Sequence, residues 1–289
     1  MKLHFYGTGA SEGVPALFCE CKYCKQIRKM GGKNYRMRTC VQLDNDVLID
    51  FSMDGYAQTL FRNLDLTAIS HLLITHSHDD HLYPLAITQV IPPKAFYDRE
   101  RVLNVYGNDK SIHKISDIIA CSVNSQAEIE KIMNNNYLGI DNYLKLNLLT
   151  MYEEFYIGKY KVLPLPANHD KKELCMIYII QDKEKTLLYG HDSSMFQENT
   201  WKELKRYKFD CVVLDCTMVE ETGIFDGHMG LPDNIKVYQR MIEEGMASEN
   251  TKFISTHFYH GFNPVHERIT PIFKKEGFIA AYDGMEIIF

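Results

Sequence analysis

Residues 75–81 read T-H-S-H-D-D-H, which places three histidines and two aspartates within seven residues. They follow the apolar run Ile69–Ile74, whose composition predicts a buried strand. Loops at strand ends commonly carry the chemistry of α/β proteins, and alternating residues such as His76 and His78 point to one side of an extended loop. Imidazole and carboxylate groups together suit Zn²⁺, Mn²⁺ or Fe. The stretch therefore predicts a metal site more strongly than a helix start with solvated histidines.

Three further candidate ligands each follow a short apolar run that predicts a strand, and they are His169, Asp192 and His257. A single histidine after a strand is usually an ordinary polar loop residue. Their shared placement at strand ends is the stronger observation, because that is where α/β proteins place their sites. The residues of the 75–81 loop cannot complete two metal sites alone, so these three are the candidates for the remaining ligands.

The composition is that of a globular protein that can bury a core without disulfides, with 289 residues, 45% hydrophobic and 24% charged. The net charge of −6 argues weakly against a protein that grips the nucleic acid backbone, although it does not exclude a local basic groove. The N-terminus lacks the apolar core of a signal peptide, and no apolar stretch approaches the length of a membrane span. Eight cysteines without a secretion signal favour a reducing compartment, so we expect a cytoplasmic protein.

Short β-rich runs alternate with amphipathic stretches, which predicts an α/β architecture built on sheets. The expected strands are Leu3–Tyr6, Val47–Ile49, Ile69–Thr75, Val102–Tyr106, Lys161–Leu165, Met176–Ile180, Thr186–Tyr189, Cys211–Leu214, Lys252–Ser255 and Met285–Phe289. The expected helices are Leu82–Val90, Thr200–Tyr207, Asn234–Glu244 and Pro264–Lys275.

The pattern H-x-H-x-D-H, followed by a histidine, an aspartate and a histidine at later strand ends, resembles the metallo-β-lactamase superfamily. The resemblance implies a four-layer αββα sandwich with a two-metal site at one edge of its sheets. The implied ligands are His76, His78 and His169 for one metal, Asp80, His81 and His257 for the other, and Asp192 as a bridge between them. Asp50, in V-L-I-D-F, matches the aspartate that closes an early strand of that fold and supports the metal loop.

Several segments also resemble the phosphodiesterases of the carbon–phosphorus lyase pathway, which open phosphoribosyl 1,2-cyclic phosphate. These segments are the glycine- and cysteine-rich stretch 7–24, P-L-P-x-N-H at 164–169, D-C at 215–216, T-H-x-x-H at 256–260 and Y-D-G-M-E-I at 282–287. The resemblance places His228, in a glycine-rich loop, at an active-site histidine that binds no metal. A histidine there can protonate the leaving oxygen of a phosphodiester. We also count the metal ligand Asp80 among the catalytic residues.

Cys19, Cys21 and Cys24 form a C-x-C-x-x-C cluster in the segment 19–24. Three thiolates so close together are more typical of a zinc site than of reduced surface thiols. A structural zinc ion takes four ligands in a tetrahedron. The resemblance implies that the fourth ligand is His260, three residues after the metal-binding histidine. One structural zinc ion is therefore expected.

The whole chain, residues 1–289, is expected to fold as one domain of this type. His81 and His169 are farther apart in sequence than we expect for close relatives, so extra chain is expected at about 111–149. Such an insertion would form a lid or wall over the site. The stretch 217–227 also departs from the family pattern. The resemblance therefore implies the chemistry of the site without fixing its substrate.

These features predict a metal-dependent phosphodiesterase that attacks a small phosphodiester, cyclic substrates included, with a hydroxide activated by two divalent metals. Zinc and manganese are the expected active-site metals, with iron as an alternative. Other interpretations stay open: a nuclease acting on RNA or DNA ends, a lactone or thioester hydrolase, and a non-catalytic metal-binding protein. A redox role with two iron ions is less favoured, because the sequence contains no recognisable flavin-binding or rubredoxin-like segment. We expect a small-molecule partner, no membrane association and, by base rate, a homodimer.

Overall fold

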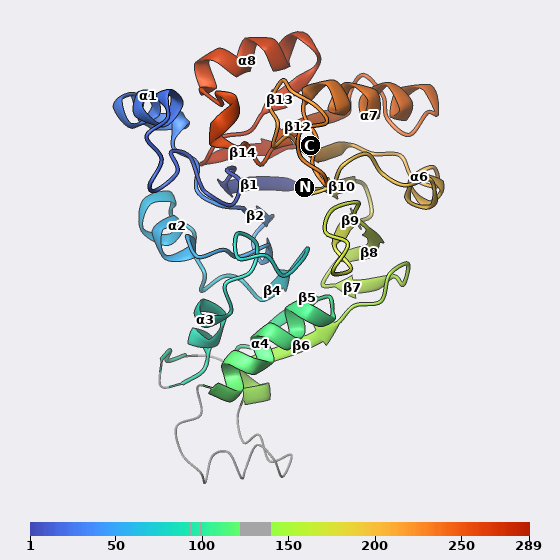
Figure 1. Ribbon diagram of the computed structural model, residues 1–289. Coiled ribbons are helices and arrows are strands. Elements are labelled where there is room, and N and C mark those ends of the chain that lie inside the picture. Colours follow the sequence, from blue (N-terminus) through green and yellow to red (C-terminus); the bar gives the residue numbers. More distant parts are fainter. Residues whose placement is uncertain (93, 99, 122–139) are drawn as a thin grey trace.

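The computed structural model describes residues 1–92, 94–98, 100–121 and 140–289, and its centre is a pair of seven-stranded sheets (Figure 1). The first sheet, in spatial order, consists of β14 (Met285–Ile288), β1 (Lys2–Gly7), β2 (Cys40–Leu43), β3 (Val47–Ile49), β4 (His71–Leu73), β5 (Leu103–Gly107) and β6 (Leu144–Leu148). The second consists of β13 (Phe278–Ala280), β12 (Lys252–Thr256), β11 (Cys211–Asp215), β10 (Thr186–Gly190), β9 (Met176–Gln181), β8 (Tyr160–Pro166) and β7 (Phe155–Ile157).

The two sheets follow the same pairing rule. In the first sheet the pairs among β14, β1, β2 and β3 are antiparallel, and the pairs from β3 to β6 are parallel. In the second sheet the pairs among β7, β8, β9 and β10 are antiparallel, and the pairs from β10 to β13 are parallel. The carboxyl ends of neighbouring parallel strands meet at one edge of a sheet, which is where such folds gather functional loops.

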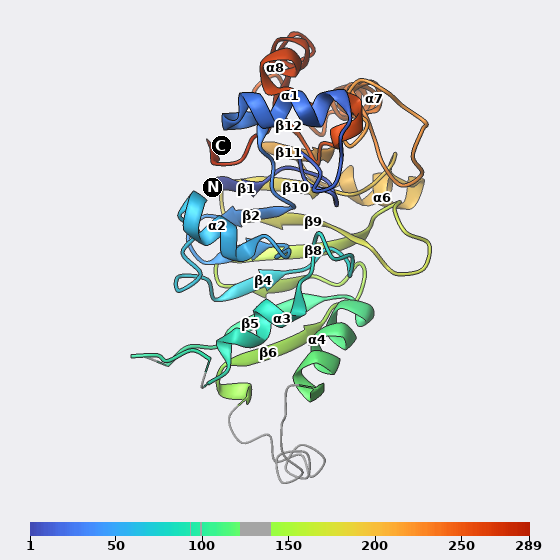
Figure 2. The ribbon, with the colours of Figure 1, turned by 60° about the vertical axis from the view of Figure 1, so that its left-hand side comes forward.

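Helices cover the outer face of each sheet, as the turned view shows (Figure 2). The helices that follow strands of the first sheet are α1 (Lys22–Met30), α2 (Gly55–Arg62), α3 (Pro84–Ile87) and α4 (Asp109–Cys121). Those of the second half of the chain are α6 (Glu198–Leu204), α7 (Leu231–Glu243) and α8 (His266–Lys275). Short 3₁₀ turns lie at Gly32–Asn34 (η1), Thr88–Val90 (η2), Ile140–Asn142 (η3) and His260–Phe262 (η4).

Three large apolar clusters separate these layers. The central cluster draws Phe5 from the first sheet and Tyr178 from the second, so it fills the space between the sheets. A second cluster joins the first sheet to Ile115 of α4, and a third joins the second sheet to Val237 of α7 and Phe273 of α8. Each sheet is therefore buried on both faces, which explains why its strands read as apolar runs. The arrangement confirms the predicted four-layer αββα sandwich.

The expected helix Leu82–Val90 is wrong in extent. The structure has only one turn of α-helix, α3, followed by the 3₁₀ turn η2. Of the expected insertion at 111–149, residues 111–121 lie in α4 and residues 144–148 form the edge strand β6, while residues 122–139 lie outside the described residues. Within the described part of the chain, no helix is both long enough and apolar enough to span a membrane.

Candidate active site

The histidine loop begins where β4 ends, and the neighbouring strand holds it in place. Because β3 and β4 are parallel neighbours, Asp50 at the end of β3 lies beside Thr75. The Asp50 carboxylate accepts hydrogen bonds from the Thr75 backbone N–H at 2.8 Å and from Thr75 Oγ1 at 2.9 Å. It also lies 2.8 Å from His81 Nδ1, which leaves His81 Nε2 for the site. This is the supporting role that the resemblance implies for Asp50.

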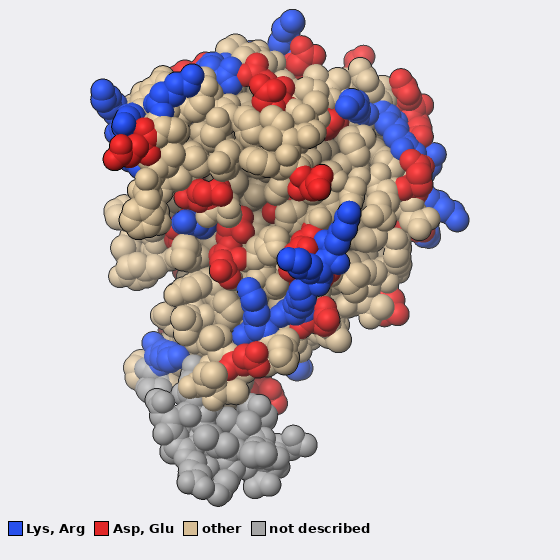
Figure 3. Space-filling model, viewed as in Figure 1, with Lys and Arg blue, Asp and Glu red and all other residues tan. Residues whose placement is uncertain are grey.

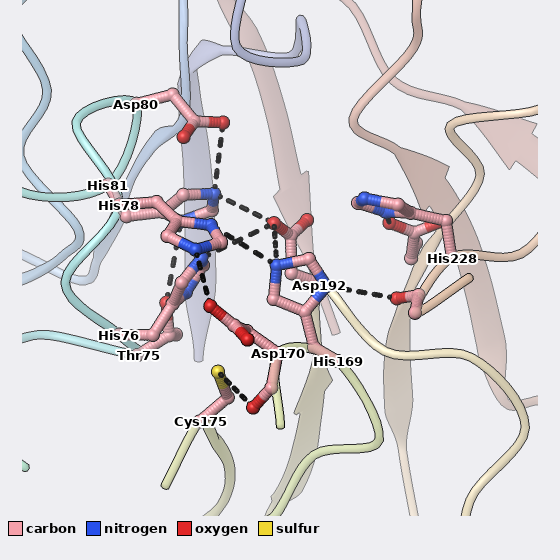
Figure 4. A network of polar contacts seen from close by, with 12 residues as sticks. Thr75, His76, His78, Asp80, His81, His169, Asp170, Cys175, Asp192 and His228 are labelled. Atoms are coloured by element: carbon pink, nitrogen blue, oxygen red, sulfur yellow. Dashed lines mark hydrogen bonds and ion pairs between the residues drawn. The ribbon is translucent and has the colours of Figure 1, made fainter. Parts of the chain in front are cut away.

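His76, His78 and His169 form the first cluster, in which the three imidazoles point toward one another (Figure 4). His169 Nε2 lies 3.3 Å from His78 Nδ1. The other nitrogen of His169, Nδ1, lies 3.1 Å from the Gly227 carbonyl oxygen, which can accept its N–H and so orient the ring. Gly227 has a φ of +79°, and a Cβ there would come within 2.8 Å of His169 Nδ1. Only glycine lets the backbone approach the ligand this closely.

Asp80, His81, Asp192 and His257 form the second cluster, and all four are buried. Asp80 Oδ2 lies 3.2 Å from His257 Nε2 and 3.3 Å from His81 Nε2. The seven residues that the resemblance names as ligands are thus brought together from the ends of four strands, β4, β8, β10 and β12.

Asp192 lies between the two clusters and is only 2% exposed. On one side its carboxylate lies 3.7 Å from Nε2 of both His76 and His169. On the other side it lies 3.0 Å from His81 Nε2 and 3.0 Å from His257 Nδ1. This is the position that a bridging ligand requires, so the geometry supports the role predicted for Asp192.

His76 Nε2, His81 Nε2 and Asp192 Oδ1 are buried and make no well-directed hydrogen bond to a described residue, and the short contacts of the last two are to ionisable neighbours in the same site. A buried polar atom without a well-directed partner costs about 1–3 kcal/mol, which a cation at the centre of these groups would offset. Imidazole nitrogens and carboxylate oxygens converging on one point are the ligands of Zn²⁺, Mn²⁺ and Fe. The donor set therefore fits two divalent cations that share Asp192.

The electrostatics of the two clusters differ. Burial lowers the pKa of His76 well below its ordinary value, which keeps this imidazole neutral, as a metal ligand must be. Burial acts in the same direction on His81 and His257, but the neighbouring carboxylates of Asp80 and Asp192 outweigh it and raise both pKa values well above the ordinary one. A cation in the second cluster would take the place of those protons, so its affinity falls as the pH falls.

His228 faces the same site from the loop that follows β11. Its Nδ1 lies 2.8 Å from Asp215 Oδ2, and Asp215 is fixed in turn by hydrogen bonds from Thr217 Oγ1 at 2.9 Å and from the Met229 N–H at 2.8 Å. Burial acts to lower the pKa of His228, but the Asp215 carboxylate outweighs it and raises that pKa above the ordinary value. An oriented imidazole whose protonated form is favoured is suited to donate a proton from Nε2.

Two buried residues of the site received no role from the sequence. Asp215 ends β11, whose parallel neighbours β10 and β12 lead to Asp192 and His257, and that shared strand-end position is the signal that could have identified it. His191 precedes Asp192 and reads as a polar loop residue. It is 1% exposed, stacks on Tyr189 with an interplanar angle of 7°, and places Nδ1 3.1 Å from Asp192 Oδ1.

The metal clusters open into a cavity of about 710 Å³ on the face shown in Figure 3. Five of the predicted ligands and His228 line it, the five being His78, Asp80, His169, Asp192 and His257. The remaining wall comes mainly from residues 10–12 after β1 and residues 224–226 before His228. The volume is that of a small-molecule site.

Cys19, Cys21, Cys24 and His260 form a separate candidate metal site beside α1 and η4. His260 Nδ1 lies 3.4 Å from Cys24 Sγ and 3.9 Å from Cys21 Sγ. Cys21 caps the N-terminus of α1, where its sulfur accepts the Cys24 N–H at 3.4 Å. Burial acts to raise the pKa of the Cys21 thiol, but the Cys24 N–H and His260 lower it to about 6, which favours the thiolate that zinc binds.

We expect Cys24→Ser to remove about one zinc ion per chain and to lower the melting temperature by several degrees, because a structural zinc contributes folding free energy directly. Cys24 is fully buried, whereas Cys121 is exposed at the end of α4 and lies outside the cluster. Metal content by mass spectrometry and melting by circular dichroism check the expectation, with Cys121→Ser as the control. Full zinc content in Cys24→Ser would contradict the site.

Known proteins share both the sequence pattern and the fold. Ribonuclease Z from Methanococcus maripaludis (strain S2) is 23% identical over 259 residues, which is 84% of this chain and 72% of that protein. An octanoyltransferase from Porphyromonas gingivalis is 35% identical over 86 residues, or 28% of this chain, and the match spans only 16% of that longer protein.

Two solved structures superpose over the whole chain. A diphosphatase of the PhnP family has 22% identity and a TM-score of 0.69, covering 100% of this chain and 97% of that one. Human tRNase Z, short form (ELAC1), has 15% identity and a TM-score of 0.64, covering 100% and 99%. At these identities the superpositions establish the fold alone. The sequence profile of the beta-lactamase superfamily domain matches residues 45–258, which is well over half of the chain and contains the β4 loop and all the predicted active-site ligands. With the sandwich and the paired clusters in place, this match makes the chain a member of the β-lactamase superfamily.

Proposed function

We propose that the protein is a metal-dependent phosphodiesterase that hydrolyses small phosphodiesters, cyclic ones included. The observation that carries the proposal is the arrangement of three components in one cavity: two His/Asp clusters, the shared Asp192, and the His228–Asp215 pair. A phosphodiester needs positive charge on its phosphate oxygens, an activated water, and a proton for the leaving oxygen. The clusters and His228 are placed to meet these needs.

Two divalent cations held by the clusters would supply a water of lowered pKa and charge to neutralise the phosphate. The chain's own residues supply the remaining steps. This water would give one proton to bulk solvent, and its oxygen would form a bond to phosphorus as the bond between phosphorus and the leaving oxygen breaks. His228 gives its Nε2 proton to the leaving oxygen, and Asp215 holds the imidazole by Nδ1, 2.8 Å away, and stabilises its charged form. The products are a phosphomonoester and an alcohol.

The relatives support chemistry at phosphorus, since their names include a ribonuclease and a diphosphatase. The finer assignments remain part of the proposal: zinc or manganese in the active site, with iron as an alternative, one structural zinc, a cytoplasmic location, and a homodimer. A nuclease is the main alternative, because ribonuclease Z and tRNase Z share the fold. Cleavage of a labelled oligonucleotide would identify it.

Protein that has been stripped of metal and reloaded with Mn²⁺ or Zn²⁺ is expected to cleave bis(p-nitrophenyl) phosphate. Turnover of the diester should exceed that of the monoester p-nitrophenyl phosphate by at least about 100-fold, because the monoester carries a second negative charge and acidic residues line the cavity beside the clusters. Release of p-nitrophenolate at 405 nm measures both rates. A reloaded protein that holds both metals and cleaves no diester would refute the proposal.

A further inference from the structure

One wall of the cavity, formed by residues 10–12 and 224–226, is not accounted for by the His/Asp clusters, and part of it is apolar. Ile224 and Phe225 line it and remain 54% and 38% exposed. The Phe225 ring meets Tyr259 edge to face, with centroids 5.4 Å apart, and meets Phe262 at 5.6 Å. Large apolar side chains left exposed in a concave site are surfaces for a ligand. The wall thus offers an aromatic platform beside the metals.

The wall is fixed relative to the metal clusters. Met218 Sδ accepts the backbone N–H groups of Ile224 and Phe225 at 3.3 and 3.4 Å, and the Gly227 carbonyl is hydrogen-bonded to His169. The other loop of this wall, which carries Glu12, is tied to the chain that follows β12, because the Ala10 N–H donates to the Phe258 carbonyl at 3.1 Å. A substrate whose phosphate lies at the clusters must therefore place its organic part against these two loops.

The charge of this wall is negative. Glu12 and Asp226 line it in addition to the metal-binding carboxylates, and among the described residues that line the cavity there is no lysine or arginine. The arginine nearest in contact, Arg38, donates to the Ser11 carbonyl at 2.6 Å and is paired with Asp54 at 3.1 Å. Figure 3 shows acidic side chains around the hollow and basic ones gathered to its lower right. Basic groups outside the lining can attract an anion but cannot pair with a second phosphate inside.

We propose that this wall selects phosphodiesters whose organic part is uncharged and carries a planar ring with O–H or N–H donors, as a nucleoside does, and rejects those with a second phosphate. The inference rests on the proposed phosphodiesterase activity and narrows its substrate. The ring stacks on Phe225 and meets Tyr259 edge to face, because the two side-chain rings stand at 85° to each other. Glu12 and Asp226 accept hydrogen bonds from ribose hydroxyls or an exocyclic amine and repel additional phosphate oxygens. The substrate thereby differs from phosphoribosyl cyclic phosphate, which carries a second phosphate.

Two matched pairs of substrates test the charge rule. One pair is adenosine 2′,3′-cyclic phosphate with and without a 5′-phosphate, and the other is ribose 1,2-cyclic phosphate with and without a 5-phosphate. With the metal-loaded full chain, kcat/KM is expected to be at least about tenfold higher for the member without the extra phosphate, the size expected for like charges several ångströms apart near a protein surface. The adenosine compound should also exceed the ribose compound.

Single substitutions assign the effect to the wall. Glu12→Lys and Asp226→Lys should each reduce or reverse the preference within both pairs, because each replaces a repelling charge by an attracting one. Phe225→Ala should lower kcat/KM for the adenosine compound about tenfold and leave the ribose compound nearly unchanged. Glu249→Lys is the control for charge alone, since Glu249 is exposed in the turn before β12, at the opposite end of that strand from His257.

The outcomes separate this inference from the function on which it rests. One outcome is that the protein cleaves bis(p-nitrophenyl) phosphate but shows an equal or higher kcat/KM for the substrates with the extra phosphate. That result would overturn the charge rule and leave the proposed phosphodiesterase activity intact. A preference that Glu12→Lys and Asp226→Lys leave unchanged would overturn the assignment to this wall. Metal-loaded protein that cleaves none of these diesters would overturn both.

Discussion

Asp192→Ala is expected to lower phosphodiester turnover by more than about 10³-fold and to leave the protein unable to hold two metals, because both clusters depend on this carboxylate. Asp192 lies within 4 Å of histidines from each cluster and is buried, so no other side chain can replace its charge. Metal content by mass spectrometry and steady-state turnover of bis(p-nitrophenyl) phosphate measure the two effects.

Two further variants sharpen this test. Asp192→Asn keeps the shape and removes only the charge, and it is expected to lose activity almost as severely as Asp192→Ala. Asp170→Asn is the matched control, because the Asp170 carboxylate reaches the clusters through Nε2 of His78, at 3.3 Å, and the pair is partly exposed. Loss of such an outer partner costs about 10- to 100-fold. Full metal content and full activity in Asp192→Asn would exclude the bridging role.

His228→Ala is expected to slow cleavage of a diester with an alkoxide leaving group by about 10²- to 10⁴-fold, the range for loss of a general acid. p-Nitrophenolate leaves as a stable anion without a proton, so bis(p-nitrophenyl) phosphate should lose far less activity. A purely structural defect would reduce both rates equally. The comparison needs only one alkyl and one nitrophenyl diester, assayed with the same metal-loaded preparation. Equal losses on both substrates would contradict the acid role.

The pH dependence of activity also tests the acid role of His228. His228 must be protonated to act, so activity with the alkyl diester is lost as the pH rises through the pKa of His228. Asp215 raises that pKa against the effect of burial. Asp215→Asn removes the carboxylate, so the alkaline limb of the profile should move to lower pH, and in His228→Ala that limb should disappear. An alkaline limb that stays at the same pH in Asp215→Asn would show that another group titrates.

The structure brings the predicted site residues together, whereas several of the elements around them differ from those expected from the sequence. His76, His78, Asp80 and His81 stand within one short loop, and the other ligands directly follow apolar runs that are buried strands. Because both faces of each sheet are covered, successive residues of a strand are apolar, and such runs can be recognised in the sequence. The strand-end position of Asp215 marks it as a site residue, but its role as the partner of His228 could not be assigned, because an irregular loop contributes His228 and the contact depends on how that loop folds back.

Several of the elements that the sequence missed are short or highly charged. β2 has four residues and β13 has three, too few for an alternating pattern to emerge. α1 is largely polar and buries only Cys24 and Ile27, so it lacks a recognisable apolar face. The expected helix Leu82–Val90 ends early because a 3₁₀ turn replaces its second half, just before the proline of residue 92.

The hydrogen bond between His169 and Gly227 makes one short loop serve two purposes. The loop that lines the cavity with Phe225 and Asp226 also orients His169 through the Gly227 carbonyl. Side-chain changes at positions 225 and 226 leave that carbonyl in place, whereas an insertion or deletion that moves the loop backbone displaces His169. Divergence in specificity through a reshaped loop backbone is therefore expected to change metal loading as well.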